Sequence, residues 1–275
     1  MSRQVAFVLG GGGHLGAAEV GMLGALFERE IKPDLIVGTS VGALHGAAAA
    51  DDPTLASVER LEVLWRRLPE LGVLGNWLTD ARALVRLRTH VRSHESLRRL
   101  ALEGLSAETF EELAVPFQCV AASIERAAEH WFSSGPLVDA ILASASVPGL
   151  LPPIEIDGEH FVDGGIVNSI PIGRAVELGA DEIYVLHVGR IERPLEVPKR
   201  LRDVALVSFE ISRRHRFVRE LAAVPEGVVV HVLPTGEPDP PRWNELSSQL
   251  SRNINDADRR IRRARQATGA YLDAR

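Results

Sequence analysis

The chain has 275 residues, of which 45% are hydrophobic and 25% are charged. A chain of this length buries about three quarters of its unfolded surface around one core, so we expect a single domain over residues 1–275. The formal net charge of −6 argues against a nucleic-acid partner, because proteins that bind phosphates usually carry an excess of Lys and Arg. The single cysteine, Cys119, excludes an internal disulfide and a cysteine-rich metal site, and it fits a reducing compartment.

The lengths of the apolar runs indicate whether the chain spans a membrane or is exported. Nowhere do about 18 apolar residues follow one another, so no membrane-spanning helix is expected and any membrane contact would be peripheral. The apolar stretch Val5–Leu9 is shorter than a signal-peptide core and runs directly into four glycines, which favours a first β-strand over an export signal. We therefore expect a cytoplasmic protein and leave peripheral contact with a membrane open.

The first fifty residues predict two strand–turn–helix units. Strands are expected at residues 5–10 and 34–38, because both are short apolar runs, and helices at 16–29 and 41–50. Two such units in succession indicate a parallel sheet with helices on its faces.

Beyond residue 50 the pattern changes. Residues from about 51 to 112 show helical spacing without strand-like runs, which predicts an inserted helical region. The strands expected after it are 116–124, 130–132, a hairpin over 154–162 that turns at Asp157-Gly158, 182–189 and 228–233. The helices expected are 137–146, 172–178, one between the last two strands, and an amphipathic helix at the C-terminus after a proline-rich connector at 236–243.

The strongest local signal is Gly38-Thr39-Ser40-Val41-Gly42. It matches G-x-S-x-G and lies between an apolar strand and a helix, which is the context that a nucleophile elbow requires. The elbow strains the serine backbone in a turn where neighbouring side chains would collide, which explains the flanking glycines. Ser40 is therefore a candidate nucleophile, and a serine that only caps the helix is the alternative.

Four consecutive glycines at residues 10–13 follow the first strand, and their unshielded N–H groups can point at an anion. Because parallel strands end at the same edge of a sheet, this loop and the elbow are expected to converge on one reacting carbonyl. The candidate oxyanion donors are the backbone N–H groups of Gly11, Gly12, Gly13 and Val41.

The glycine loop has a rival interpretation as a dinucleotide-binding turn, because Gly11-x-Gly13-x-x-Gly16 satisfies that fingerprint. The acidic residue of that motif belongs at the carboxyl end of the second strand, whereas Asp34 precedes the strand. A nucleotide-binding protein is thus the weaker alternative.

Asp163 follows a predicted strand and opens the turn Asp163-Gly164-Gly165, where its carboxylate either faces a cleft or only forms the turn. A general base at neutral pH needs an apolar setting and a short contact to the nucleophile, because an exposed aspartate has a pKa of about 3.9. A Ser-His-Asp triad with His187 is a further alternative, since His187 follows Asp163 in the order known for α/β-hydrolases.

Taken together, the motifs at 11–16, 38–42 and 163–165 resemble the patatin-like phospholipase family in their order and separation. The resemblance spans about residues 4–190 and extends to the run 143–148, Pro152-Pro153, Asn168 and Pro171. It implies a Ser–Asp dyad formed by Ser40 and Asp163 without a histidine, a glycine-rich oxyanion loop, and hydrolysis of acyl esters in membrane lipids or lysolipids.

One position departs from the family pattern. The family usually carries Arg or Lys just before the last glycine of the loop, where this chain has Leu15. His14 either replaces the missing cation in part or simply starts the helix. Backbone donors do not depend on that side chain, so the loop is still expected to bind an oxyanion.

We therefore expect a three-layer α/β/α fold with a mainly parallel sheet and a helical insertion over the active-site edge. The expected activity is that of a serine acyl hydrolase of the phospholipase A, lysophospholipase or carboxylesterase type, acting on a lipid or another acyl ester. No metal or organic cofactor is implied. A catalytically silent lipid-binding or interaction module of the same fold is the remaining alternative.

Overall fold

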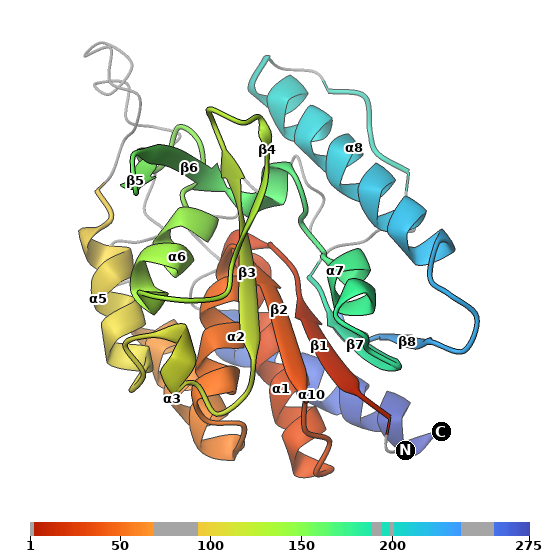
Figure 1. The fold of residues 1–275 in the computed structure, drawn as a ribbon. Coiled ribbons are helices and arrows are strands. Elements are labelled where there is room, and N and C mark those ends of the chain that lie inside the picture. The colour runs from red at the N-terminus through yellow and green to blue at the C-terminus, as the bar shows by residue number, and fades with distance from the viewer. Residues whose placement is uncertain (1–2, 69–92, 189–193, 199–200, 238–255) are drawn as a thin grey trace.

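The computed structural model describes residues 3–68, 93–188, 194–198, 201–237 and 256–275, and one eight-stranded sheet runs through them (Figure 1). The strands are β1 (Val5–Leu9), β2 (Leu35–Thr39), β3 (Phe117–Ser123), β4 (Ala128–Phe132), β5 (Ile154–Ile156), β6 (Glu159–Asp163), β7 (Glu182–Leu186) and β8 (Val229–Val232). Their order across the sheet is β5-β6-β3-β2-β1-β7-β8. The remaining strand, β4, pairs with β3 and stands outside this order.

The core of the sheet is parallel. The pairs β2–β3, β1–β2, β1–β7 and β7–β8 are all parallel, whereas β4 and β6 run antiparallel to β3 and β5 runs antiparallel to β6. Parallel strands are usually covered on both faces and are then rich in apolar residues, as β1 is, and every residue of β2 is buried. The prediction of a mainly parallel α/β sheet is confirmed.

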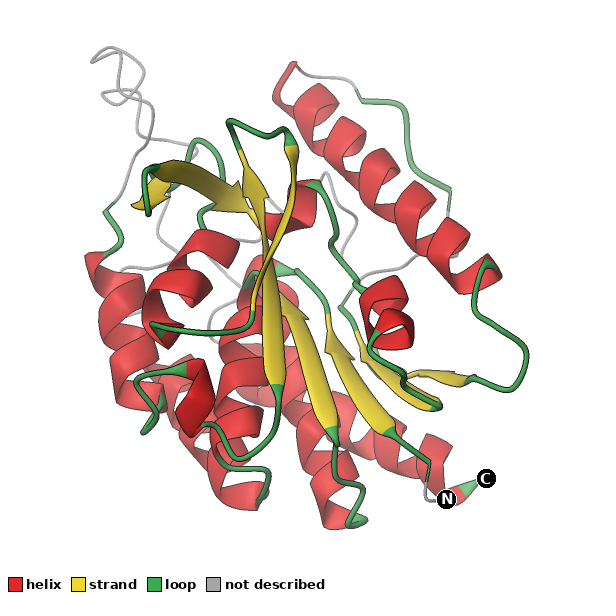
Figure 2. Cartoon of the chain, in the orientation of Figure 1, coloured by secondary structure: helices red, strands yellow, loops and turns green. Residues whose placement is uncertain are grey.

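Helices cover both faces of this sheet (Figure 2). They are α1 (Ala17–Glu28), α2 (Val41–Asp51), α3 (Leu55–Arg67), α5 (Glu95–Gly104), α6 (Leu137–Ser144), α7 (Ile172–Glu177), α8 (Leu201–Ala222) and α10 (Ala257–Asp273). The side chains of alternate residues in β1 pack into two separate hydrophobic clusters. Phe7 and Leu9 pack with α1, α2, α3 and α10, whereas Ala6 and Val8 pack with α7 and with Phe217 of α8.

The described residues between β2 and β3 are helical. Beyond α2 they form α3, α5 and a short 3₁₀ turn, Phe110–Glu112, within the range 51–112 where helices were expected. Residues 69–92 of that range lie outside the described residues, as do residues 238–243 of the expected connector. The hairpin between β5 and β6 turns at Asp157 and Gly158, both with positive φ, as predicted.

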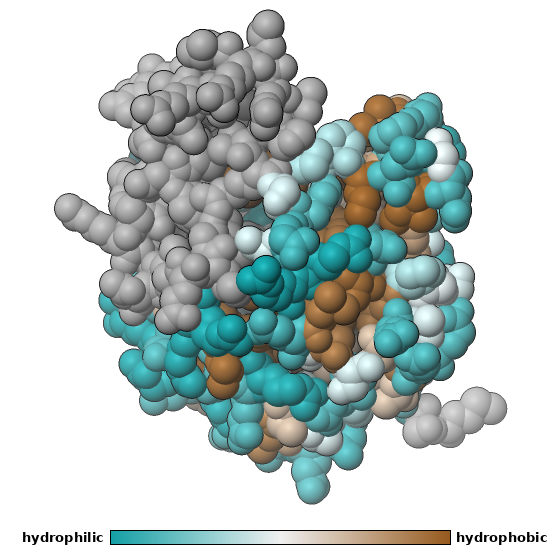
Figure 3. All heavy atoms as spheres, turned by 90° about the vertical axis from the view of Figure 1, so that its left-hand side faces the viewer, coloured by the Kyte–Doolittle hydropathy of each residue, from teal (hydrophilic) through white to brown (hydrophobic). Residues whose placement is uncertain are grey.

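On the face that Figure 3 shows, apolar side chains form separate patches among polar ones. Within the described ranges, no helix combines the length and the apolar character needed to cross a membrane.

Candidate active site

Ser40 occupies a sharp turn between β2 and α2. Its backbone has φ 57° and ψ −123°, a conformation that residues other than glycine rarely adopt. The turn is crowded, because a Cβ at Gly38 would lie 2.5 Å from the Gly42 carbonyl oxygen and a Cβ at Gly42 would lie 2.4 Å from the Leu9 carbonyl oxygen. Glycine is thus needed on both sides of Ser40, where α2 meets the ends of β1 and β2.

Asp163, the last residue of β6, lies directly beside this serine. The Ser40 hydroxyl donates a hydrogen bond to Asp163 Oδ2 over 2.6 Å, and the Gly165 N–H donates to Asp163 Oδ1 over 2.7 Å. Both Ser40 and Asp163 are buried, at 7% and 5% exposure. The carboxylate is therefore held in one orientation toward the hydroxyl, which is the geometry required of a general base.

Burial also changes the basicity of this carboxylate. It raises the pKa of Asp163 to about 6, and the hydrogen bonds from Ser40 and from the Gly165 N–H offset part of that increase. The carboxylate is still mostly ionised at neutral pH, and it binds a proton more readily than an exposed aspartate does. Its pKa thus lies close to the value that suits a base working near neutral pH.

The C-terminal end of α6 supports both members of this pair. The Ser144 hydroxyl accepts a hydrogen bond from the Ser40 N–H over 2.9 Å and donates one to the Val120 carbonyl over 2.6 Å. The Ser146 carbonyl accepts a hydrogen bond from the Asp163 N–H over 2.9 Å. No local motif marks these serines for this role, and their only signal in the sequence is their place in the run 143–148.

The glycine loop runs alongside the elbow, and its N–H groups differ in what they bind. The Gly11 N–H donates to the Ser169 carbonyl over 2.8 Å, so it is not available to an oxyanion and leaves the predicted donor set. Within the described part of the chain, no hydrogen bond is seen from the N–H groups of Gly12 and Gly13. Val41 is the first residue of α2, and the first N–H groups of a helix have no intrahelical acceptor.

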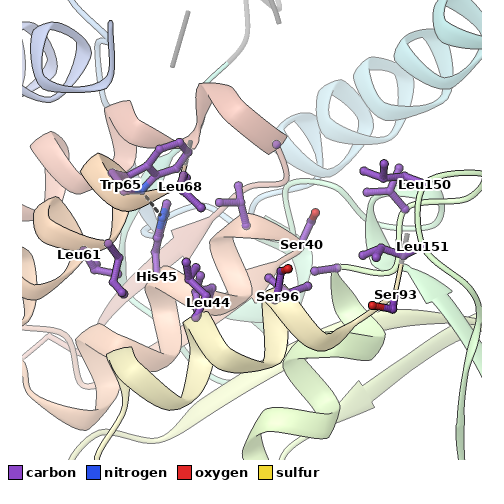
Figure 4. A pocket seen from close by; sticks show the side chains of 17 residues that line it. Ser40, Leu44, His45, Leu61, Trp65, Leu68, Ser93, Ser96, Leu150 and Leu151 are labelled. Carbon is purple, nitrogen blue, oxygen red and sulfur yellow. Dashed lines mark hydrogen bonds between the residues drawn. The ribbon is translucent and has the colours of Figure 1, made fainter. Parts of the chain in front are cut away.

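An apolar cavity of about 280 Å³ opens beside Ser40 (Figure 4). Its lining includes Gly13 and Val41 of the two loops, and the rest of its wall is mainly aliphatic. These further lining residues are Leu44, His45, Leu61, Leu64, Trp65, Leu68, Ser93, Ser96, Leu97, Leu100, Ala145, Val147, Leu150 and Leu151. Ser40, Asp163 and an apolar cavity thus meet at the carboxyl edge of the parallel strands.

A buried polar chain stiffens one wall of the cavity. The Trp65 indole N–H donates to His45 Nε2 over 3.0 Å, and His45 Nδ1 lies 2.8 Å from Glu19 Oε2. Because an indole only donates, the neutral imidazole carries its proton on Nδ1 and donates it to Glu19. Burial lowers the pKa of His45 to about 3, so the ring stays neutral, and burial raises the pKa of Glu19.

The comparisons with known proteins agree with this geometry. The profile of the family "Patatin-like phospholipase" matches residues 7–176, which is more than half of the chain. The chain belongs to the patatin-like phospholipase family. "Lysophospholipase nte1" of Emericella nidulans is 32% identical over 190 residues, and "Patatin-like phospholipase domain-containing protein ZK370.4" of Caenorhabditis elegans is 34% identical over 200 residues.

Each of these relatives aligns with 69% of this chain, but the chain spans only 12% and 14% of their respective lengths. Among solved structures, VipD from Legionella pneumophila superposes with a TM-score of 0.51 at 15% identity, over 100% of this chain and 67% of that one. At that identity the likeness concerns the fold alone.

Two alternative interpretations of the motifs do not fit this patatin-like site. Ser40 contacts Asp163 directly, so no imidazole lies between them as a triad requires. His187 is buried, packs against Phe217, and has a pKa lowered to about 3 by burial and then by Arg213. Asp34 accepts a hydrogen bond from the Val5 N–H at the opposite end of the sheet, where it cannot bind a ribose beside the glycine loop.

Proposed function

We propose that this patatin-like chain is a serine lipid acyl hydrolase that works through an acyl-enzyme with Ser40 as nucleophile and Asp163 as base. The hydrogen bond of 2.6 Å between the two side chains, at the mouth of an apolar cavity, carries the proposal. The relatives named lysophospholipases support a lipid ester as the substrate class. Peripheral membrane contact remains a prediction.

The reaction proceeds in two steps. Asp163 accepts the hydroxyl proton while Ser40 Oγ attacks the ester carbonyl, and the N–H groups of Gly12, Gly13 and Val41 stabilise the oxyanion. The tetrahedral intermediate expels the alcohol, which takes the proton from Asp163. Water then attacks the acyl-enzyme, Asp163 accepts its proton, and the fatty acid leaves as the proton returns to Ser40.

The cavity indicates which part of the substrate it holds. The cavity volume of about 280 Å³ leaves room for several methylene groups. An aliphatic wall favours a hydrocarbon chain because it removes apolar surface from water. We therefore assign the cavity to the acyl chain of the substrate.

A fluorophosphonate probe tests the nucleophile. Ser40 Oγ is expected to displace fluoride and form a phosphonyl ester, which peptide mass spectrometry will locate on the peptide containing Ser40. Ser40→Ala and heat-denatured protein serve as unlabelled controls. A folded protein that binds lipid vesicles and is not labelled would instead establish the silent module.

Filling the cavity is expected to change chain-length preference. Leu61 is 1% exposed and lies at the far end of the cavity from Ser40 (Figure 4). Leu61→Phe should lower kcat/KM for a ten-carbon nitrophenyl ester by about tenfold, since one or two displaced methylenes are worth about 1–2 kcal/mol, and should leave a four-carbon ester within about twofold.

Val63 provides the matched control for this experiment. It lies on the same helix but is 48% exposed, so Val63→Phe should leave the ratio of the two kcat/KM values unchanged. An equal loss for both esters in Leu61→Phe would show that the cavity does not hold the acyl chain.

A further inference from the structure

Arg213 of α8 reaches the glycine loop from 202 positions away in the sequence. Its Nη1 donates a hydrogen bond to the Gly11 carbonyl oxygen over 3.0 Å, and the side chain is only 6% exposed. Its Nε lies 3.3 Å from Glu210 Oε2 one turn earlier. A guanidinium keeps its charge in proteins, so a buried cation lies directly behind the loop.

The acceptor of this hydrogen bond belongs to the peptide group that joins Gly11 to Gly12. A trans peptide is planar and its C=O and N–H point in opposite directions, and no cis peptide occurs among the described residues. Fixing the Gly11 oxygen toward Arg213 therefore directs the Gly12 N–H away from it. That N–H is one of the three donors proposed for the oxyanion.

The loop needs such an anchor, because four consecutive glycines have more backbone freedom than other residues. A hydrogen bond from a cation to the carbonyl also polarises the peptide group, so the Gly12 N–H becomes a stronger donor. The patatin-like pattern that this loop resembles usually has Arg or Lys at the position of Leu15. Arg213 brings a positive charge to the same loop from a different element.

The same helix also contacts the segment that follows Asp163. Arg216 Nη1 donates to the Val167 carbonyl over 2.8 Å, and Glu220 accepts from the Gly173 N–H over 2.9 Å. Figure 1 shows α8 on the α7 side of the sheet. The helix thus joins the oxyanion loop to the segment that follows the base.

We propose that Arg213 is the positioning residue of the oxyanion loop, orienting and polarising the Gly11–Gly12 peptide in place of the basic residue that Leu15 replaces. The proposal rests on the hydrolase function proposed above. In this role Arg213 stabilises charge in the transition state and does not bind the substrate. Its loss should therefore lower kcat and leave KM nearly unchanged.

Arg213→Met tests the proposal, with kcat measured per active site titrated by the fluorophosphonate. We expect kcat to fall about 10- to 50-fold, less than the 100-fold or more that follows direct loss of an oxyanion donor, with KM within about twofold. Arg219→Met, at an exposed position of the same helix, should keep the wild-type kcat. The pH midpoint set by Asp163 should not move.

Several outcomes would overturn the proposal. A purely structural role would lower the thermal midpoint and the fraction of active sites while leaving kcat per site within twofold. If Arg213→Met does not fold, Arg213→Gln decides, because its neutral amide keeps a polar side chain at this position but supplies no cation. A wild-type kcat in that variant would refute the proposal, whereas at least a threefold loss would support it. Failure of the hydrolase function itself would instead appear as an inactive, unlabelled wild type.

Discussion

Asp163→Asn is expected to lower turnover by on the order of a hundred-fold or more. The amide has nearly the shape of the carboxylate, and its oxygen can still accept from the Gly165 N–H. Its NH2 group then faces the Ser40 hydroxyl, and it cannot take the proton. Turnover of a short-chain nitrophenyl ester measures the loss. His187→Ala is the control, since a histidine outside the dyad contributes packing, and it should keep most of the turnover per folded molecule. Collapse in His187→Ala alone would refute the dyad.

The wild-type pH profile follows from the same carboxylate. Because only ionised Asp163 accepts a proton, kcat/KM should rise with pH through the folded pKa of about 6 and reach a plateau above it. A profile without a titration between about pH 5 and 7 would contradict the assignment of Asp163 as base.

Stability should change in the opposite direction. A carboxyl whose folded pKa of about 6 exceeds its usual 3.8 holds its proton longer in the folded state, so the free energy of unfolding falls as pH rises from 3.8 to about 6. The full difference of about two pH units corresponds to about 3 kcal/mol. Asp163→Asn lacks this penalty. It should be more stable than wild type at pH 8, with the advantage shrinking toward pH 4 in urea unfolding.

Much of the fold is predictable because its signals are local. The apolar run of β1 and the elbow after β2 are contiguous in the sequence, and the observed elements begin and end within about one or two residues of the expected positions there. The elbow glycines Gly38 and Gly42 are predictable for the same reason, since a strained turn requires small neighbours wherever it occurs.

The remaining features depend on which segments the fold brings together. Ser144 supports the Ser40 backbone from 104 positions away, and Arg213 reaches the glycine loop from 202 positions away. No local pattern marks either residue. A distant contact also determines which N–H groups of the glycine loop are available to an oxyanion. The Gly11 N–H is unavailable because it donates to the Ser169 carbonyl. Sequence spacing locates Ser40 and Asp163 as the candidate nucleophile and base, whereas tertiary contacts determine how the two side chains are held.

Gly42→Ala is expected to cause the largest loss of stability. The added methyl group would lie 2.4 Å from the Leu9 carbonyl oxygen and 2.8 Å from that of Gly10, and backbone atoms cannot rotate away as a side chain does. The start of α2 must therefore move off the end of β1. Overpacking of this kind costs about 1–3 kcal/mol or more, so the urea midpoint should fall by a corresponding amount.

The same displacement should also reduce turnover, because Ser40 immediately precedes α2 while the oxyanion loop continues from β1. A shift of about 1 Å between reacting groups is enough to lower the rate by on the order of a hundred-fold. Activity per folded molecule should thus fall together with stability.

Gly24→Ala provides the matched control, since Gly24 is also a buried glycine within an α-helix. Its new methyl group would meet Arg265 Nε at 3.1 Å, the end of a flexible side chain that can move. Alanine also favours a helix by about 1 kcal/mol over glycine, so this variant should match or exceed wild-type stability and keep its turnover. If both alanine variants behaved like wild type, the contact between α2 and the end of β1 would not be what holds Ser40 against the glycine loop.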